Sequence, residues 1–320
     1  MSAATRAAVA TIEAHLPFLD TLAARLGAET RDDPLALARI TILLPTRRAC
    51  RALAEAFLRR SDGKPLLLPR LEPVGDLDAE DLAFLADEGE AADLELPPAI
   101  PGLRRRLRLA RLVRAAKPDL LPGQAAMLAG ALVRFLDEAQ TEGADFANLA
   151  RLVPEDLAIH WQDILRFLGI VTDVWPALLA ELGALDPAER RNRVLALQAE
   201  RWRTSPPADP VIAAGLTGGV PAVAALMAVV ARLPNGTVVL PGLDRGAPED
   251  VWAAIRADPG HPQHLLAAFL ERIEMTPAEV EAWEMPGLAA GPRARIQLAA
   301  DALLPAGLTH RSRQAGRVGR

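Results

Sequence analysis

The chain contains a single cysteine, Cys50, among its 320 residues. One thiol excludes an internal disulfide framework, and it excludes a zinc site or an iron–sulfur cluster held by four cysteines of this chain. A free cysteine most often behaves as a small apolar side chain in a core. We therefore expect Cys50 to be packing material.

Long apolar runs and tyrosine are missing as well. No apolar run approaches the ~20 residues that span a bilayer, so we expect no contact with a membrane. The segment Met1–Ala10 lacks the pattern of a secretory signal, which predicts a cytoplasmic protein. Aromatic residues make up 4% of the chain, which leaves few side chains on which the bases of a single strand could stack.

Lysine is scarce, and the chain has only Lys64 and Lys117. An ATP site of the P-loop kind needs a glycine-rich turn after a strand and a lysine at the terminal phosphates. Leu58 stands where the first glycine before Lys64 would be, and the turn Glu13–Pro17 has neither glycine nor lysine. We predict no P-loop ATP site. The arginine bias fits phosphate recognition and GC-rich coding alike, and the net charge of −5 restricts any nucleic-acid contact to local patches.

Short apolar segments near both ends of the chain predict an α/β fold with a parallel sheet, because strands buried on both faces are short apolar runs that alternate with helices. Between the two groups of strands, long helical periodicity predicts an inserted all-helical subdomain. We expect an α/β core of residues 1–75 and 208–305, a helical insertion of 76–207 and a disordered tail of 306–320. The expected strands are Val9–Ile12, Ile40–Leu44, Val211–Ala214 and Thr237–Leu240, with Leu66–Leu68 as a fifth candidate.

Three helical signals lie inside the insertion. One apolar stripe runs from Leu128 to Ala139, and another runs from Leu157 to Leu182 with an expected break near Gly169 and Pro176. A further helix is expected to start at Pro187, with Asp186 as its N-terminal cap.

The segment Ile40–Leu53 predicts a strand, a turn and a helix. Thr46 is the expected cap, and Arg47 and Arg48 follow it in the first helical turn. Backbone N–H groups at a helix start, with arginines beside them, suit a phosphate. The alternative is that these arginines are solvated charges on a helix face.

The densest basic stretch contains Arg104, Arg108 and Arg111. On a helix these three share a face, and we expect it to lie beside an apolar stripe that includes Leu103 and Leu107. Such a face could contact a DNA backbone. The alternative is a solvated face that pairs with the acidic segment just before it.

The loop after the strand Val211–Ala214 resembles an anion-binding turn, with Gly215, Thr217, Gly218 and Gly219 before a helix that opens at Val220-Pro221. Its glycines could equally serve tight packing of strand and helix.

Other residues with chemical potential carry weaker signals. Asp244 follows a strand, but Pro241 and Gly242 intervene and favour a loop cap. His261 and His264 would need further ligands to hold zinc. The acidic cluster Asp137, Glu138 and Glu142 is most simply a solvated face. We therefore expect no metal, no cofactor and no catalytic residue in this chain.

An ordered set of motifs resembles the N-terminal part of the AddB subunit of bacterial AddAB helicase–nucleases, most closely the alphaproteobacterial type. The resemblance covers residues 9 to 305. The motifs are ILLPTRRA at 42–49, LLLPRLEPVGD at 66–76, DPAERRNR at 186–193, PVIAAGLTGGVPA at 210–222, VVLPGLD at 238–244 and DPGHPQ at 258–263.

The resemblance implies a superfamily-1 helicase-like core without an ATP site, divided by a helical insertion. It implies a part of a double-strand break repair complex that guides DNA ends and single-stranded DNA and supports an AddA-type helicase–nuclease partner. Thr46, Arg47 and Arg48 match the helicase motif that commonly touches the single strand. Family members are longer and carry an iron–sulfur cluster and Mg in a C-terminal nuclease domain, so we expect a truncated chain without activity by itself.

Two other hypotheses remain from the sequence. One is a small α/β transferase that holds a phosphate or nucleotide at Gly215–Gly219. The other is a nonfunctional truncated product.

Overall fold

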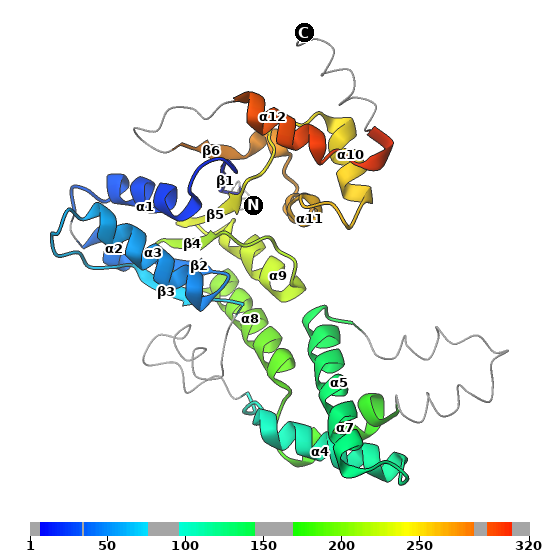
Figure 1. Cartoon of the computed structure of the whole chain (residues 1–320). Coiled ribbons are helices and arrows are strands. Elements are labelled where there is room, and N and C mark those ends of the chain that lie inside the picture. The colour runs from blue at the N-terminus through cyan, green and yellow to red at the C-terminus, as the bar shows by residue number, and fades with distance from the viewer. Residues whose placement is uncertain (1–6, 34, 76–95, 145–168, 285–292, 309–320) are drawn as a thin grey trace. The chain divides into compact units, whose positions relative to one another are not determined.

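The computed structural model describes residues 7–33, 35–75, 96–144, 169–284 and 293–308 (Figure 1). The chain divides into two compact units, one made of residues 1–76 and 198–320 and the other of residues 77–197. The acidic segment 76–95, the first part of the Leu157–Leu182 stripe and most of the expected tail lie outside the described residues.

The first unit is built on a six-stranded, all-parallel sheet with the order β3-β2-β4-β5-β1-β6. The predicted α/β class with a parallel sheet is therefore confirmed. Each of the four principal strand predictions corresponds to a strand. The strands are β1 (Val9–Ile12), β2 (Thr41–Leu44), β3 (Arg70–Pro73), β4 (Val211–Ala214), β5 (Gly236–Pro241) and β6 (Glu281–Trp283).

The candidate strand Leu66–Leu68 is wrong, because the strand that pairs with β2 begins at Arg70. The backbone N–H of Arg70 donates to the Ile40 carbonyl oxygen over 2.9 Å, and the three leucines before it are 41 to 55% exposed. Pro65 and Pro69 flank these leucines, and proline has no N–H to give to a ladder. The edge strand β6 was missed, because three residues beginning with glutamate carry almost no alternation signal.

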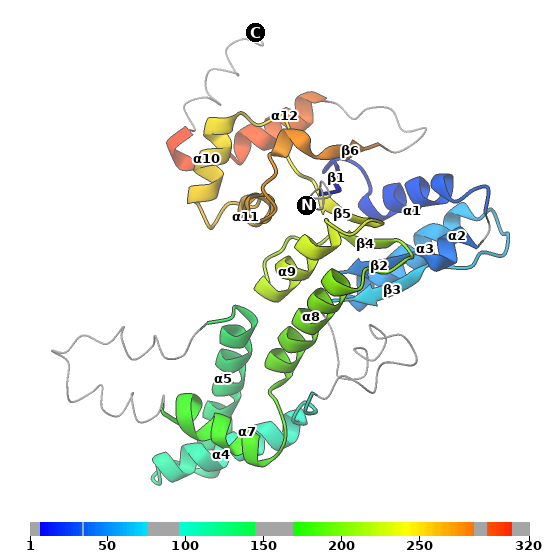
Figure 2. The ribbon, with the colours of Figure 1, turned by 180° about the vertical axis from the view of Figure 1, so that it is seen from behind.

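Helices cover both faces of this sheet (Figures 1 and 2). On one face, α1 and α3 pack against Ile12, Ile42 and Val239 in a single apolar cluster. On the other face, α9 contacts β4 and β5, and α11 contacts α9. Coverage of both faces explains why β1 and β4 are buried along their whole length. The helices of this unit are α1 (Phe18–Glu29), α2 (Ala36–Arg39), α3 (Arg47–Arg60), α9 (Pro221–Val230), α10 (Glu249–Ala257), α11 (His264–Arg272), η5 (Pro277–Glu279), α12 (Arg293–Ala302) and η6 (Ala306–Leu308).

The described elements of the second unit are helical, apart from one bridge between Ala99 and Leu185. Its core contains Leu109 and Val113 of α4, Leu132 and Leu136 of α5, and Trp175. Helix α8 begins in this unit and ends in the first. The elements are α4 (Gly102–Ala116), α5 (Pro122–Thr141), η4 (Ile170–Val174), α7 (Trp175–Glu181) and α8 (Pro187–Thr204).

The break expected near Gly169 and Pro176 coincides with a π-helical turn. This turn, η4, covers Ile170–Val174, and Pro176 follows it in the first turn of α7. A proline cannot donate to the carbonyl one turn back and clashes with it, so a wider turn just before Pro176 accommodates the ring.

Helix α4 buries a side other than the one that carries Leu103 and Leu107. Leu103 and Leu107 are 73% and 56% exposed, whereas Arg105, Leu109 and Val113 are buried. Arg104, Arg108 and Arg111 do lie beside Leu103 and Leu107, since all five residues line one hollow. Arg105 occupies a buried position that an apolar residue would usually hold. It can do so because it has a charged partner inside this unit.

That partner is Asp186, which is fully buried. Its Oδ1 lies 2.7 Å from Arg105 Nε, and its Oδ2 accepts hydrogen bonds from Trp175 Nε1 at 2.9 Å and Gln140 Nε2 at 2.8 Å. Asp186 directly precedes α8 as predicted, but neither carboxylate oxygen caps the helix, because Oδ2 serves α5 and α7 and Oδ1 has no hydrogen-bond donor. The carboxylate instead joins three helices of the second unit, α4, α5 and α7.

Among the described helices, none has both the length and the apolar character that crossing a membrane requires.

Candidate nucleic-acid interface

The junction between β2 and α3 has the local geometry expected from the sequence. Thr46 is the N-cap of α3 in an extended conformation, and its Oγ1 accepts a hydrogen bond from the Ala49 N–H over 3.1 Å. This bond satisfies one of the N–H groups that a helix start leaves unpaired. Arg47 and Arg48 follow in the first turn, and both are exposed. The predicted capping role of Thr46 is confirmed.

The charges at the start of α3 oppose the helix dipole. The N-terminus of a helix carries a partial positive charge, and α3 has two arginines and no acidic residue in its first turn. A like charge there costs on the order of 0.3–1 kcal/mol. An anion bound at this helix start would interact favourably with both arginines and with the dipole.

The position of this junction in the sheet also suits a ligand. Strands β2 and β4 are parallel neighbours, with Leu43 beside Ala213, so their carboxyl ends lie at one edge. Helix α3, after β2, and helix α9, after β4, cover opposite faces of the sheet. Such a topological switch point is where open parallel sheets bind ligands. The structure thus places Thr46–Arg48 and Gly215–Gly219 at neighbouring carboxyl ends.

The glycines after β4 have packing reasons of their own. Gly215 and Gly218 have φ angles of +71° and +75°, which favour glycine. A Cβ at Gly215 would lie 3.2 Å from the Phe18 ring, and one at Gly219 would lie 3.1 Å from Leu265. Pro221 in the first turn of α9 lacks one N–H that a bound anion would use. Tight packing therefore accounts for this loop without a ligand.

A close backbone approach, which sequence reasoning missed, fixes the β2–α3 junction from the side of β3. The N–H of Gly75 donates to the Pro45 carbonyl oxygen over 3.1 Å. A Cβ at Gly75 would lie only 2.3 Å from that oxygen. A glycine that follows a strand was the available signal, since such glycines often mark a close backbone approach.

The turn after β1 is built by local contacts. The N–H of Leu16 donates to the Glu13 carbonyl oxygen over 3.0 Å, and His15 Nδ1 lies 3.3 Å from a Glu13 carboxylate oxygen. Ala14 packs where a Cβ on Gly242 would approach, at 3.1 Å. No glycine or lysine of this turn is available for a phosphate, because the turn contains neither.

The three arginines Arg104, Arg108 and Arg111 lie in the second unit, on α4. With Pro101, Leu103 and Leu107 they line an open hollow of about 400 Å³. In the described part of the chain, none of these three guanidinium groups has a carboxylate within ion-pair distance.

The residues considered for metal binding make other contacts. Asp244 Oδ1 accepts a hydrogen bond from the Gly246 N–H over 3.0 Å, which is the loop-cap role. His261 Nε2 and His264 Nδ1 lie within hydrogen-bond distance of the Leu303 and Ile255 carbonyl oxygens. Over residues 7–308, less the gaps given above, no three His, Cys, Asp or Glu side chains gather as a metal site would require.

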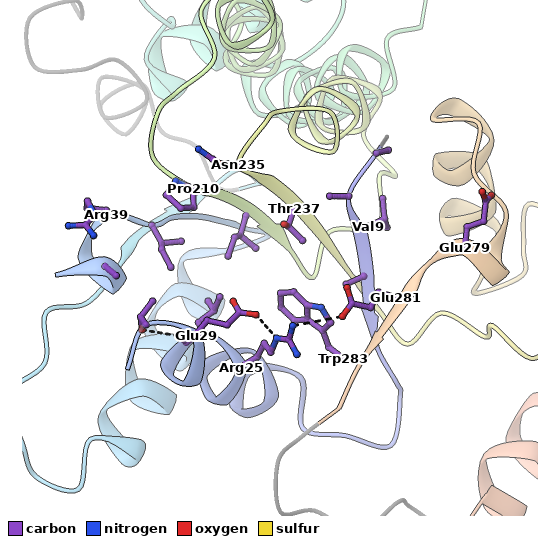
Figure 3. A pocket seen from close by; sticks show the side chains of 18 residues that line it. Val9, Arg25, Glu29, Arg39, Pro210, Asn235, Thr237, Glu279, Glu281 and Trp283 are labelled. Carbon is purple, nitrogen blue, oxygen red and sulfur yellow. Dashed lines mark hydrogen bonds and ion pairs between the residues drawn. The ribbon is translucent and has the colours of Figure 1, made fainter. Parts of the chain in front are cut away.

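A cavity of about 580 Å³ lies at the opposite, amino-terminal edge of the sheet (Figure 3). Arg25 lies over the Trp283 ring, 5.4 Å from its centroid, and pairs with Glu29 and Glu281. Arg39 lines the cavity, and a hydrogen bond from Arg39 and another from the Leu35 N–H lower the pKa of Asp33. None of the predicted site residues lines this cavity. The carboxyl edge is the better candidate, because parallel sheets bind ligands there.

Neither a scan against models of known protein families nor a search of curated proteins finds a match for this chain.

Proposed function

We propose that this chain is the catalytically inactive, helicase-like part of a subunit of a double-strand break repair helicase–nuclease. In this role it binds and guides DNA and supports an AddA-type partner. The observation that carries the DNA-binding proposal is the pair Arg47 and Arg48 in the first turn of α3, at the switch point of a parallel sheet. The motif resemblance supplies the helicase-like and repair parts of the proposal.

The turn after β1 supports a role without ATP hydrolysis. In a P-loop protein a glycine-rich turn after a strand surrounds the phosphates and a lysine contacts them. Here the turn Glu13–Pro17 has neither residue. DNA would therefore be held and directed by this chain, while the partner supplies the energy for movement.

The proposal is tested by binding of the chain to a fluorescent DNA end with a single-stranded tail, with and without the AddA-type partner. Joint replacement Arg47→Ala and Arg48→Ala should weaken binding at least about tenfold, because two charge-assisted contacts to phosphate are lost.

Arg60→Ala is the matched control, since Arg60 is an exposed arginine at the other end of the same helix. It should change the affinity by less than about twofold. Equal effects of the two sets of substitutions would contradict the proposed site.

The alternative, a transferase that holds a nucleotide at Gly215–Gly219, predicts a different result. A nucleotide at one hundred times its Kd would stabilise the chain by about 2.7 kcal/mol and raise its melting temperature. We expect no such rise with ATP, ADP or GTP in a thermal melt, because packing already accounts for these glycines. A nucleotide-dependent rise that is lost in Thr217→Val would favour the transferase.

A further inference from the structure

Helix α4 presents a face that combines apolar and basic side chains and is exposed except for the half-buried Arg108. We call Leu103, Arg104, Leu107, Arg108 and Arg111 the arginine–leucine face. These residues recur at the three- and four-residue spacing that puts side chains on one side of a helix. Leu103 and Leu107 are among the most exposed large apolar side chains described, at 73% and 56%.

The helix cannot turn to bury these leucines, because its other side is fixed. Arg105, Leu109 and Val113 are almost fully buried, and Arg105 is paired with Asp186 and Asp137. Burial of a leucine side chain is favourable because it removes apolar surface from water. A segment that covers both leucines would thus gain appreciable free energy.

The chemistry of the face favours a polypeptide with carboxylates. The three guanidinium groups bind anions, and carboxylates and phosphates both match their geometry. The leucines pack against apolar groups, which a phosphodiester backbone does not offer. An acidic polypeptide segment that also carries leucines satisfies both requirements.

The sequence contains such a segment directly before α4. Residues 76–95 include nine acidic residues and no basic residue, and they also include Leu77, Leu82, Phe84, Leu85 and Leu94. This segment lies outside the described residues, and six residues, 96–101, separate it from the start of α4. A short connection of this kind gives a tethered group an effective concentration in the millimolar range.

We propose that the arginine–leucine face of α4 binds the acidic segment 76–95 of the same chain. The interaction pairs its arginines with carboxylates and covers Leu103 and Leu107. It is independent of the DNA contact proposed at Arg47 and Arg48.

Zero-length carbodiimide coupling tests this contact in the full chain, because the reagent joins a lysine amine to a carboxylate that touches it. The native chain has only two lysines, so a new one gives a distinct product. Arg108→Lys keeps the charge and places an amine on the face. After digestion and mass spectrometry, we expect Lys-specific crosslinks from position 108 to acidic residues within 76–95, in the monomer.

Arg106→Lys is the matched control. Arg106 has nearly the same separation along the chain from the acidic segment, but its side chain lies against Gly130 of α5. We expect at least about fivefold less coupling to 76–95 from this position. A second variant, Leu107→Ser with Arg108→Lys, should reduce coupling several-fold, because the apolar part of the contact is lost.

Equal coupling from positions 106 and 108 would overturn the proposal, since it would reflect tether length alone. Crosslinks found only in dimers would assign the face to a second copy. Absence of coupling, together with weaker DNA binding by Arg108→Ala, would assign it to DNA. Each of these results contradicts the proposal.

Discussion

Replacing Arg105 by alanine should lower the free energy of unfolding of the helical unit by about 3–5 kcal/mol. Arg105 is 2% exposed, its Nε lies 2.7 Å from Asp186 Oδ1, and its Nη1 donates to Asp137 Oδ1 over 2.6 Å. Without the guanidinium group, the fully buried Asp186 carboxylate would have no counter-charge beside it. Loss of one partner of a buried pair is costly for that reason.

Hydrogen exchange of the α4 and α5 amides under native conditions measures this effect where it arises. Arg114→Ala is the control, because Arg114 is an exposed arginine of the same helix, and its loss should cost less than about 0.5 kcal/mol. A change below about 1 kcal/mol in Arg105→Ala would show that the ion pair is not essential to the packing of these helices.

Gly75→Ala should both destabilise the α/β unit and weaken DNA binding. An added Cβ would lie 2.3 Å from the Pro45 carbonyl oxygen, and a backbone atom cannot move aside as a side-chain end can. Overpacking of this kind typically costs about 1–3 kcal/mol. Because Pro45 directly precedes Thr46, the same shift would displace the first turn of α3. Urea denaturation and titration with the tailed DNA measure the two effects.

Gly27→Ala is the control for this substitution. Gly27 lies within α1, and a Cβ there meets nothing within 4 Å. It should stabilise the helix by about 0.5–1 kcal/mol and leave DNA binding unchanged. If Gly75→Ala were equally harmless, the β3 side of the junction would not hold the arginines in place.

Local signals in the sequence predicted the elements that depend on local physics. Four apolar runs identified β1, β2, β4 and β5, and Thr46 was recognised as a helix cap. These features depend on burial of a short run and on one side chain next to its own backbone. They carry the same meaning wherever the segment lies in a fold.

Features that depend on distant partners could not be predicted in the same way. Arg105 and Asp186 are 81 positions apart, and nothing in either neighbourhood indicates a buried pair. The apolar stripe of Leu103 and Leu107 was recognised from the sequence, but the burial of Arg105 was not. The strand β6 was missed because a short strand at the sheet edge is defined by its pairing with β1.

The sequence predicted which residues form the candidate site, but it did not predict how they are arranged in space. Thr46, Arg47 and Arg48 were recognised from the strand-to-helix transition. Their position at a switch point depends on the order of the strands, which brings β4 beside β2 although more than 160 residues separate them. The glycines after β4 were ambiguous in the sequence, since packing and anion binding both favour glycine. Phe18 and Leu265 provide the packing reason.

The salt dependence of binding to single-stranded DNA tests the central claim most directly. Each phosphate contact contributes about 0.7 to the slope of log K against log salt concentration for a single strand. The account predicts that Arg47→Ala with Arg48→Ala lowers the magnitude of this slope by about 1.4, two contacts in all, and that Arg60→Ala leaves it unchanged. An equal slope of log K against log salt concentration for the double variant and the unmodified chain would contradict a phosphate site at the start of α3.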